Sequence, residues 1–308
     1  MSASTGRALD LRMRAALEAL LTTDAYKLGH AQQYPPGTDA VFVNFTARAS
    51  RIAGVDATVF FGLQAALEQL NEAWAPFFGL RSGRLNAVLD EYRRFVRDLI
   101  GTDAAVDTEK FEALHAIGYL PLRIRAFREG QIVPIKVPYL TVENTDASAF
   151  WLPTYLETVL SASLWQPITT ATLAWRMRRM LDAQAARSGD PEAVPFQAHD
   201  FSFRGMAGVE AAAASGAAHL TSLVGTDTLP AISYAQHYYP GSPAGEVIGA
   251  SCAATEHSVM CAQGRAGEFE VFARLLDAYP SGVLALVSDS YDLWRVLTDY
   301  LPRLREPI

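Results

Sequence analysis

The sequence predicts an α/β protein, with an N-terminal α+β domain at residues 1–190 and an incomplete (β/α) barrel at residues 191–308. Three observations support this prediction. Short apolar runs in the second half are followed directly by polar clusters, as at the carboxyl ends of barrel strands. Small-residue stretches such as residues 211–214 fit helices between those runs. The first half instead mixes helical periodicity with β-branched segments.

The first domain is predicted from its periodicity. Residues 17–30 predict a helix that breaks into a polar turn, and residues 41–46 predict a strand. Residues 122–126 and 132–142 predict an antiparallel sheet with edge strands. An amphipathic helix is expected where apolar residues recur at helical spacing, with its stripe facing a core: Leu85, Val88, Leu89, Tyr92, Phe95, Val96 and Leu99.

The second domain is predicted to begin after a basic amphipathic helix at residues 175–186. The sequence Ser-Gly-Asp-Pro at residues 188–191 marks the expected boundary. Beyond it, three apolar runs predict buried parallel strands joined by crossover helices: residues 196–198, 220–224 and 283–287. Because a closed eight-stranded barrel takes about 250 residues, the barrel is expected to be incomplete.

Composition limits the class of protein. The chain has 308 residues and is 50% hydrophobic, which predicts a globular protein. A net charge of −7 argues against nucleic-acid or anionic-membrane partners. Cys252 and Cys261 are too few for a disulfide framework and are read as reduced thiols. With no apolar stretch of about 18 residues and no signal-peptide segment, we expect a cytoplasmic protein.

Three residues after the barrel-strand runs suit a flat heteroaromatic ring that bears an amide. Phe201 can stack on the ring, Arg204 can donate to the amide oxygen, and Asp227 can accept from the amide NH₂ group. An ionised aspartate would repel a carboxylate, so amide is predicted over acid. The alternatives are core packing for Phe201, a structural ion pair for Arg204 and a helix cap for Asp227.

His257 is the candidate general base or phosphoryl acceptor, with Glu256 or Asp289 as the carboxylate that orients it. It follows a small-residue loop at residues 249–254, including Ser251, that a ligand can approach closely. A lone histidine is more often structural, and this reading is stronger for three others: His199, His219 and His237. The sequence has no zinc-ligand spacing, Walker-A loop or Gly-x-Gly-x-x-Gly motif, so no metal-ligating residues are predicted.

Near the amino terminus, residues 23–27 combine an acid, an aromatic residue and a base in one polar turn. Taken alone, this is a solvated turn. If a symmetric dimer packs it over the partner's strand ends, Tyr26 could stack on the ring face opposite Phe201.

Ordered segments across nearly the whole chain resemble the nicotinamide phosphoribosyltransferases of the type II phosphoribosyltransferase group. These segments lie at residues 23–27, 33–36, 61–64, 199–205, 225–228, 256–258 and 288–292. The resemblance implies a catalytic set and a substrate-binding set. The former is His257, Glu256 and Asp289; the latter is Asp24, Tyr26, His199, Phe201, Arg204, Asp227 and Ser251.

The resemblance further implies formation of nicotinamide mononucleotide and pyrophosphate from nicotinamide and phosphoribosyl pyrophosphate. It implies a homodimer with a shared site, in which Phe201 and the other protomer's Tyr26 sandwich nicotinamide. It also implies magnesium with the pyrophosphate, and ATP as a coupling substrate that phosphorylates His257. The pyridine nitrogen attacks the anomeric carbon through a transition state of oxocarbenium character, which positioning and charge stabilise.

Two departures from the resembled pattern are expected to matter. The sequence lacks the family's later Arg-Pro-Asp-Ser-Gly motif and glycine-rich loops, and Ser202-Phe203 stands where the family often has Gly-Tyr. We therefore expect a chain without the C-terminal third, inactive alone or dependent on that segment, which gene fragmentation removed or a second polypeptide supplies. The rivals are a nicotinate phosphoribosyltransferase and a non-catalytic fragment that binds pyridines or regulates by mixed dimers.

Overall fold

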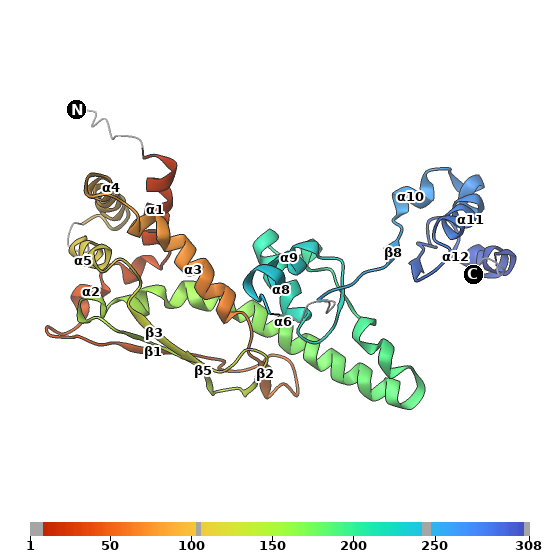
Figure 1. The fold of residues 1–308 in the computed structure, drawn as a ribbon, viewed down its shortest axis with the longest axis horizontal. Helices are drawn as coiled ribbons and strands as arrows, with labels where there is room; N and C mark the ends of the chain where they lie inside the picture. Colours follow the sequence, from red (N-terminus) through yellow and green to blue (C-terminus); the bar gives the residue numbers. More distant parts are fainter. Residues whose placement is uncertain (1–8, 103–105, 242–247, 305–308) are drawn as a thin grey trace. The chain divides into compact units, whose positions relative to one another are not determined.

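The computed structural model describes residues 9–102, 106–241 and 248–304, arranged in two compact units at residues 1–249 and 250–308 (Figure 1). Each unit is described by itself. The predicted domains, 1–190 and 191–308, stay a prediction; the predicted boundary lies inside the first unit, just after its longest helix.

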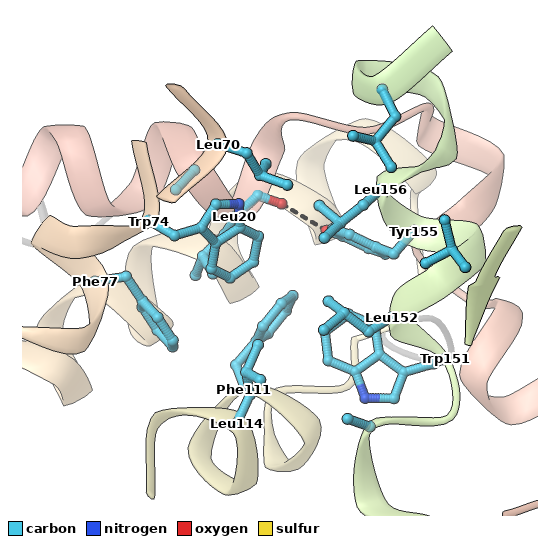
Figure 2. Packing of buried hydrophobic residues seen from close by; sticks show 14 of the residues in the cluster. Leu20, Leu70, Trp74, Phe77, Phe111, Leu114, Trp151, Leu152, Tyr155 and Leu156 are labelled. Carbon is cyan, nitrogen blue, oxygen red and sulfur yellow. Dashed lines mark hydrogen bonds between the residues drawn. The ribbon is translucent and has the colours of Figure 1, made fainter. Parts of the chain in front are cut away.

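Helices build the main core of the first unit. Helices are predicted in two of these segments, before the polar turn near the amino terminus and at the amphipathic stripe. Aromatic and leucine side chains from several helices interlock there, and the buried Tyr155 hydroxyl donates to Leu20 O at 2.5 Å (Figure 2). The helices and the 3₁₀ turn of this part are α1 (Leu11–Leu21), η1 (Ala25–Lys27), α2 (His30–Gln33), α3 (Leu63–Phe78), α4 (Ser82–Ile100) and α5 (Glu109–Ile117).

The amphipathic stripe on α4 is confirmed for five of its seven residues. Leu85, Val88, Leu89, Tyr92 and Val96 are buried. Phe95 and Leu99 are exposed, so their inclusion was wrong. On an ideal helix, which turns about 100° per residue, Phe95 lies at the edge of the buried stripe. Leu99 lies within the stripe but on the last turn of α4, which ends at Ile100.

Two antiparallel sheets flank the helices, whereas the sequence predicts one. The larger has the order β1-β5-β3, with Val142 at the centre between Val43 and Ile124. The smaller pairs β2 with β4. The strands are β1 (Phe42–Thr46), β2 (Ala57–Val59), β3 (Leu122–Ala126), β4 (Ile132–Pro134) and β5 (Pro138–Asn144).

One long helix, α6 (Leu152–Ser188), joins the N-terminal part of this unit to the part of the unit that begins after residue 188. The predicted helix at residues 175–186 is the C-terminal part of α6. The helix packs on β1, β2 and β5 and also on α8, as its course in Figure 1 shows. Short 3₁₀ turns precede and follow it: η2 (Ala147–Ala149) and η3 (Pro191–Phe196).

The rest of the first unit contains a short parallel pair, β6 (His199–Asp200) with β7 (Gly225–Thr226). The parallel pairing is confirmed, but the predicted positions were wrong. Residues 220–222 instead form a turn after α8, and Leu223 N donates to His219 O at 3.2 Å. Three helices accompany this pair: α7 (Ser202–Gly205), α8 (Val209–His219) and α9 (Leu229–Tyr238).

The second unit has a core of its own, around Met260, Phe272 and Tyr300. A parallel pair joins β8 (Ala253–Ala254) to β9 (Leu284–Ala285), which falls in the predicted run at residues 283–287. The prediction that this strand is buried was wrong, since Leu284 is half-buried and Ala285 is exposed. The remaining elements are α10 (His257–Cys261), η4 (Arg265–Gly267), α11 (Glu268–Ala278), α12 (Leu293–Arg295), the π-helical turn η5 (Val296–Tyr300) and α13 (Leu301–Arg303).

Within the described ranges, no helix combines the length and apolar character that crossing a membrane requires.

Candidate active site

The parallel pair β6 and β7 brings two predicted site residues together. Parallel strands end at the same edge of a sheet, and here His199 Nδ1 lies 3.3 Å from Asp227 Oδ2. Asp227 N also donates to Asp200 O at 3.0 Å, which ties the two strand ends together. A Cβ on Gly225 would come within 2.5 Å of His199 Cδ2. The glycine therefore permits the close approach, a role that the sequence reasoning did not assign to it.

Phe201 and Arg204 lie on the turn directly after β6. Phe201 is 50% exposed, so the core-packing alternative for it is wrong. The Arg204 guanidinium carbon lies 5.6 Å from the centre of the Phe201 ring, within reach of a cation–π interaction. Thr228, not Asp227, is the N-cap residue of α9, so the helix-cap alternative for Asp227 is also wrong. This edge therefore offers an aromatic face, a guanidinium and a carboxylate.

His219 lies buried beneath this edge, on α8. Its Nε2 is 3.3 Å from Ala198 O, just before β6. Burial lowers the pKa of His219, although the charge of Asp200 acts in the opposite direction. The residue is structural, in agreement with the reading favoured for it above.

The polar turn near the amino terminus is anchored on α6. Lys27 is 1% exposed; its amine donates to Thr154 O at 2.8 Å and forms an ion pair with Glu157. Asp24 accepts a hydrogen bond from Thr158. The interpretation of a merely solvated turn is therefore wrong. The anchoring residues Glu157 and Thr158 were missed, because they lie some 130 positions away and nothing local marks them.

This anchoring fixes which side chain of the turn faces outward. Tyr26, between the two anchored residues Asp24 and Lys27, is 64% exposed and meets the His30 ring edge-on at 5.2 Å. An exposed tyrosine on a rigid turn is suited to stacking against a ligand or another chain.

The second unit holds a second histidine–aspartate pair. His257, at the start of α10, places Nε2 at 3.0 Å from Asp289 Oδ1. The neighbouring Glu256 instead accepts a hydrogen bond from the Ser258 hydroxyl. Of the two candidate orienters, Asp289 is therefore the one that the structure places against the histidine. Ser251, also in this unit, has its hydroxyl 3.5 Å from Cys252 O.

Neither pair forms a metal centre. In the part of the chain that the structure describes, no three His, Cys, Asp or Glu side chains are grouped so that they could hold a metal ion.

Two family models match separate parts of the chain. Residues 18–74 match the N-terminal domain of nicotinamide phosphoribosyltransferase, and residues 196–308 match the nicotinate phosphoribosyltransferase family. The first range includes the anchored polar turn, and the second includes both histidine–aspartate pairs.

Relatives and solved structures agree with these matches. A nicotinamide phosphoribosyltransferase from Acinetobacter baylyi is 46% identical over 95% of this chain and 58% of its own length. One from Xanthomonas campestris pv. campestris is 38% identical over 94% of this chain and 59% of its own length. The chain thus spans less than two thirds of either relative.

Two solved structures show the same fold. Human nicotinic acid phosphoribosyltransferase matches with a TM-score of 0.52 and 18% identity, over 78% of this chain and 40% of that one. Nicotinate-nucleotide pyrophosphorylase from Pyrococcus furiosus matches with a TM-score of 0.56 and 14% identity, over 100% of this chain and 59% of that one. The chain is a nicotinamide phosphoribosyltransferase-like member of the type II phosphoribosyltransferase family.

Proposed function

We propose that this chain binds nicotinamide and takes part in its conversion, with phosphoribosyl pyrophosphate, to nicotinamide mononucleotide and pyrophosphate. The observation that carries this proposal is the grouping of Phe201, Arg204 and Asp227 at the ends of β6 and β7. The relatives named nicotinamide phosphoribosyltransferase support the same substrate.

The chemistry of this group favours the amide over the acid. The carboxylate of Asp227 accepts hydrogen bonds and has no proton to donate when ionised, so it suits the NH₂ of a carboxamide. It would repel the carboxylate of nicotinate, which makes nicotinate the less favoured substrate. Arg204 would donate to the amide oxygen while Phe201 stacks on the pyridine ring.

A second protomer is part of the proposal. Thr158, which bonds Asp24, and Thr170, which contacts the α8 hydroxyl of Ser215, are twelve residues apart on α6, or about 18 Å at 1.5 Å per residue. Tyr26 and Phe201 are therefore attached to distant parts of one helix. A homodimer in which each protomer's Tyr26 covers the other's Phe201 gives a sandwich that one chain does not provide.

His257 is proposed to couple ATP hydrolysis to the reaction. Asp289 faces Nε2, so the other ring nitrogen, Nδ1, is the one available to attack the γ-phosphorus of ATP. An N–P bond forms as ADP leaves, and Asp289 stabilises the positive charge on the ring. Magnesium, when bound with the phosphates, neutralises their charge. Under this proposal the protein acts in the cytoplasm.

The first test is product formation by the purified chain. Nicotinamide or nicotinate is supplied with phosphoribosyl pyrophosphate, magnesium and ATP. The proposal is supported if nicotinamide gives its mononucleotide and nicotinate gives no product. If nicotinamide binds but no product forms, the chain is the pyridine-binding part of an enzyme that needs a further segment. Absence of both binding and product contradicts the proposal.

The matched variant is Asp227→Asn, with Asp182→Asn as control. An asparagine retains the size of Asp227 but removes the charge that repels nicotinate, so we expect the preference for nicotinamide to fall by about tenfold or more. Asp182 is an aspartate on α6 that pairs with Arg178, and its replacement should leave the preference unchanged. Unchanged discrimination in Asp227→Asn would remove Asp227 from the proposed site.

A further inference from the structure

A chain of hydroxyl groups anchors the turn that carries Phe201 and Arg204. Asp200 Oδ1 accepts hydrogen bonds from both the backbone N of Ser202, at 3.3 Å, and the Ser202 hydroxyl. The same hydroxyl lies 3.0 Å from Ser215 Oγ on α8, and Ser215 Oγ lies 3.1 Å from Thr170 Oγ1 on α6. This series of hydrogen bonds therefore runs from the turn that carries Phe201 and Arg204, through α8, to the longest helix, α6.

The Asp200 carboxylate, at one end of this hydrogen-bonded series, is buried. Asp200 is 7% exposed and Ser215 is 1% exposed. Its other oxygen, Oδ2, has no hydrogen-bond partner among the residues that the structure describes. A buried carboxylate therefore depends on the donors that reach Oδ1. The hydroxyl groups of Ser202, Ser215 and Thr170 carry three protons, and the series from Asp200 to Thr170 has three links, so each link can have one donor.

Phe201 and Arg204 depend on this anchor because the core does not hold them. Both side chains are exposed, and α7 is only four residues long. Their positions follow from the backbone of residues 200–205. At the strand end, Asp200 O accepts from Asp227 N at 3.0 Å and from the Thr228 hydroxyl at 3.5 Å. Beyond Asp200, Phe203 N donates to Thr228 Oγ1 at 3.4 Å, which is long for a strong hydrogen bond.

We infer that Ser202 is a positioning residue for the pyridine pocket, whose hydroxyl fixes Phe201 and Arg204 by linking Asp200 to Ser215. The inference rests on the proposed function, since it assigns Phe201 and Arg204 to a pyridine ligand. Ser202 itself touches no substrate in this proposal.

The test compares nicotinamide binding by variants of the full chain, measured by isothermal titration calorimetry. Ser202→Ala removes the hydroxyl from both links, and we expect nicotinamide to bind about tenfold more weakly. Ser215→Ala removes the links to Ser202 and to Thr170 but leaves the bond from Ser202 to Asp200, and about threefold weaker binding is expected. Ser202→Thr keeps the hydroxyl and should bind within about twofold of the unchanged chain. The control Ser163→Ala removes a hydroxyl that bonds Val159 O on α6, and should have no effect.

Amide hydrogen exchange on the same variants tests the anchor without any ligand. Arg204 N donates to Phe201 O at 3.0 Å and Met206 N donates to Ser202 O at 3.0 Å, so both amides report on the turn. We expect Ser202→Ala, but not Ser163→Ala, to speed their exchange by about tenfold. Since Ser215→Ala leaves Asp200 its direct donors, it keeps the test usable if Ser202→Ala does not fold.

The outcomes separate this inference from the proposed function. If the unchanged chain does not bind nicotinamide, the proposed function fails, and exchange alone then decides whether Ser202 holds the turn. If the chain binds nicotinamide but Ser202→Ala binds equally well, with unchanged exchange, the inference is overturned. It is also overturned if Ser202→Thr binds as weakly as Ser202→Ala, because the hydroxyl is then not the cause.

Discussion

The two histidine–aspartate pairs of this chain have similar geometry but very different surroundings. His199 and Asp227 are 3.3 Å apart, with side chains 21% and 34% exposed. His257 and Asp289 are 3.0 Å apart, with side chains 65% and 69% exposed. In each unit, a parallel pair of strands precedes the aspartate. The same local sequence pattern therefore produced one enclosed pair and one open pair.

Under the proposed function, the two pairs suit different ligands because they differ in exposure. The enclosed pair stands on buried Asp200 and His219 and beside an aromatic ring and a guanidinium, which fits a small flat molecule held by fixed contacts. The open pair gives solvent access to a histidine, which fits a group that must meet a large phosphorylated substrate.

The largest expected effect separates the two pairs by their chemistry. His257→Ala should reduce phosphoryl transfer from ATP labelled at its γ-phosphate to the protein to less than about 1% of the unchanged level. Nicotinamide binding should remain, since the pyridine pocket is assigned to the first unit.

Asp227→Asn is the reciprocal variant. It should weaken nicotinamide recognition and leave the labelling of the protein intact. If His257→Ala still becomes labelled, or if Asp227→Asn abolishes labelling, the division of roles between the enclosed and the open pair is wrong.

The sequence could predict which polar segments lie at strand ends because they follow strand-like runs, and barrel folds place their sites at such ends. It correctly predicted the α/β class, the antiparallel sheet and the parallel pairing. It could not choose Asp289 over Glu256 as the partner of His257, because that choice depends on a residue 32 positions away. It could not find Glu157 or Thr158 for the same reason. Sequence periodicity reports on one element at a time, whereas these contacts need packed elements.

The second prediction concerns the frame beneath the enclosed pair. A Cβ on Gly216 would lie 2.5 Å from Ala231 Cβ and 2.8 Å from Asp200 Oδ2, both closer than packed atoms allow. Gly216→Ala should therefore lower the free energy of unfolding by about 2 kcal/mol, as overpacking does, measured by urea denaturation. Gly83→Ala is the control, because nothing lies within 4 Å of a Cβ there. In a helix it should be neutral or stabilise by up to about 1 kcal/mol.

A third, smaller effect is pH dependence from His219 under the enclosed pair. Burial lowers its pKa in the folded state, so the unfolded chain binds the proton more readily. The stability that neutral His219 contributes is therefore fully present above its unfolded pKa of about 6.5 and is lost as pH falls toward the folded pKa. His219→Gln retains a donor for Ala198 O and does not titrate. Urea denaturation at pH 7.5 and 5.5 should show a smaller loss of stability in this variant, and an equal loss would assign the pH dependence to other groups.

The smallest expected effect is the change in the free energy of unfolding when the open pair is broken. It tests whether Asp289 serves the fold or the chemistry of His257. Exposed ion pairs contribute less than about 1 kcal/mol and are screened by salt. Asp289→Ala should therefore change the free energy of unfolding by no more than that amount. The change should be even smaller in about 0.5 M salt, where the Debye length is only about 4 Å. Urea denaturation at low and high salt measures both values. A loss above about 2 kcal/mol would show that Asp289 is structural. A small loss together with weaker labelling of His257 would mean that the aspartate contributes to the chemistry of the histidine rather than to the stability of the fold.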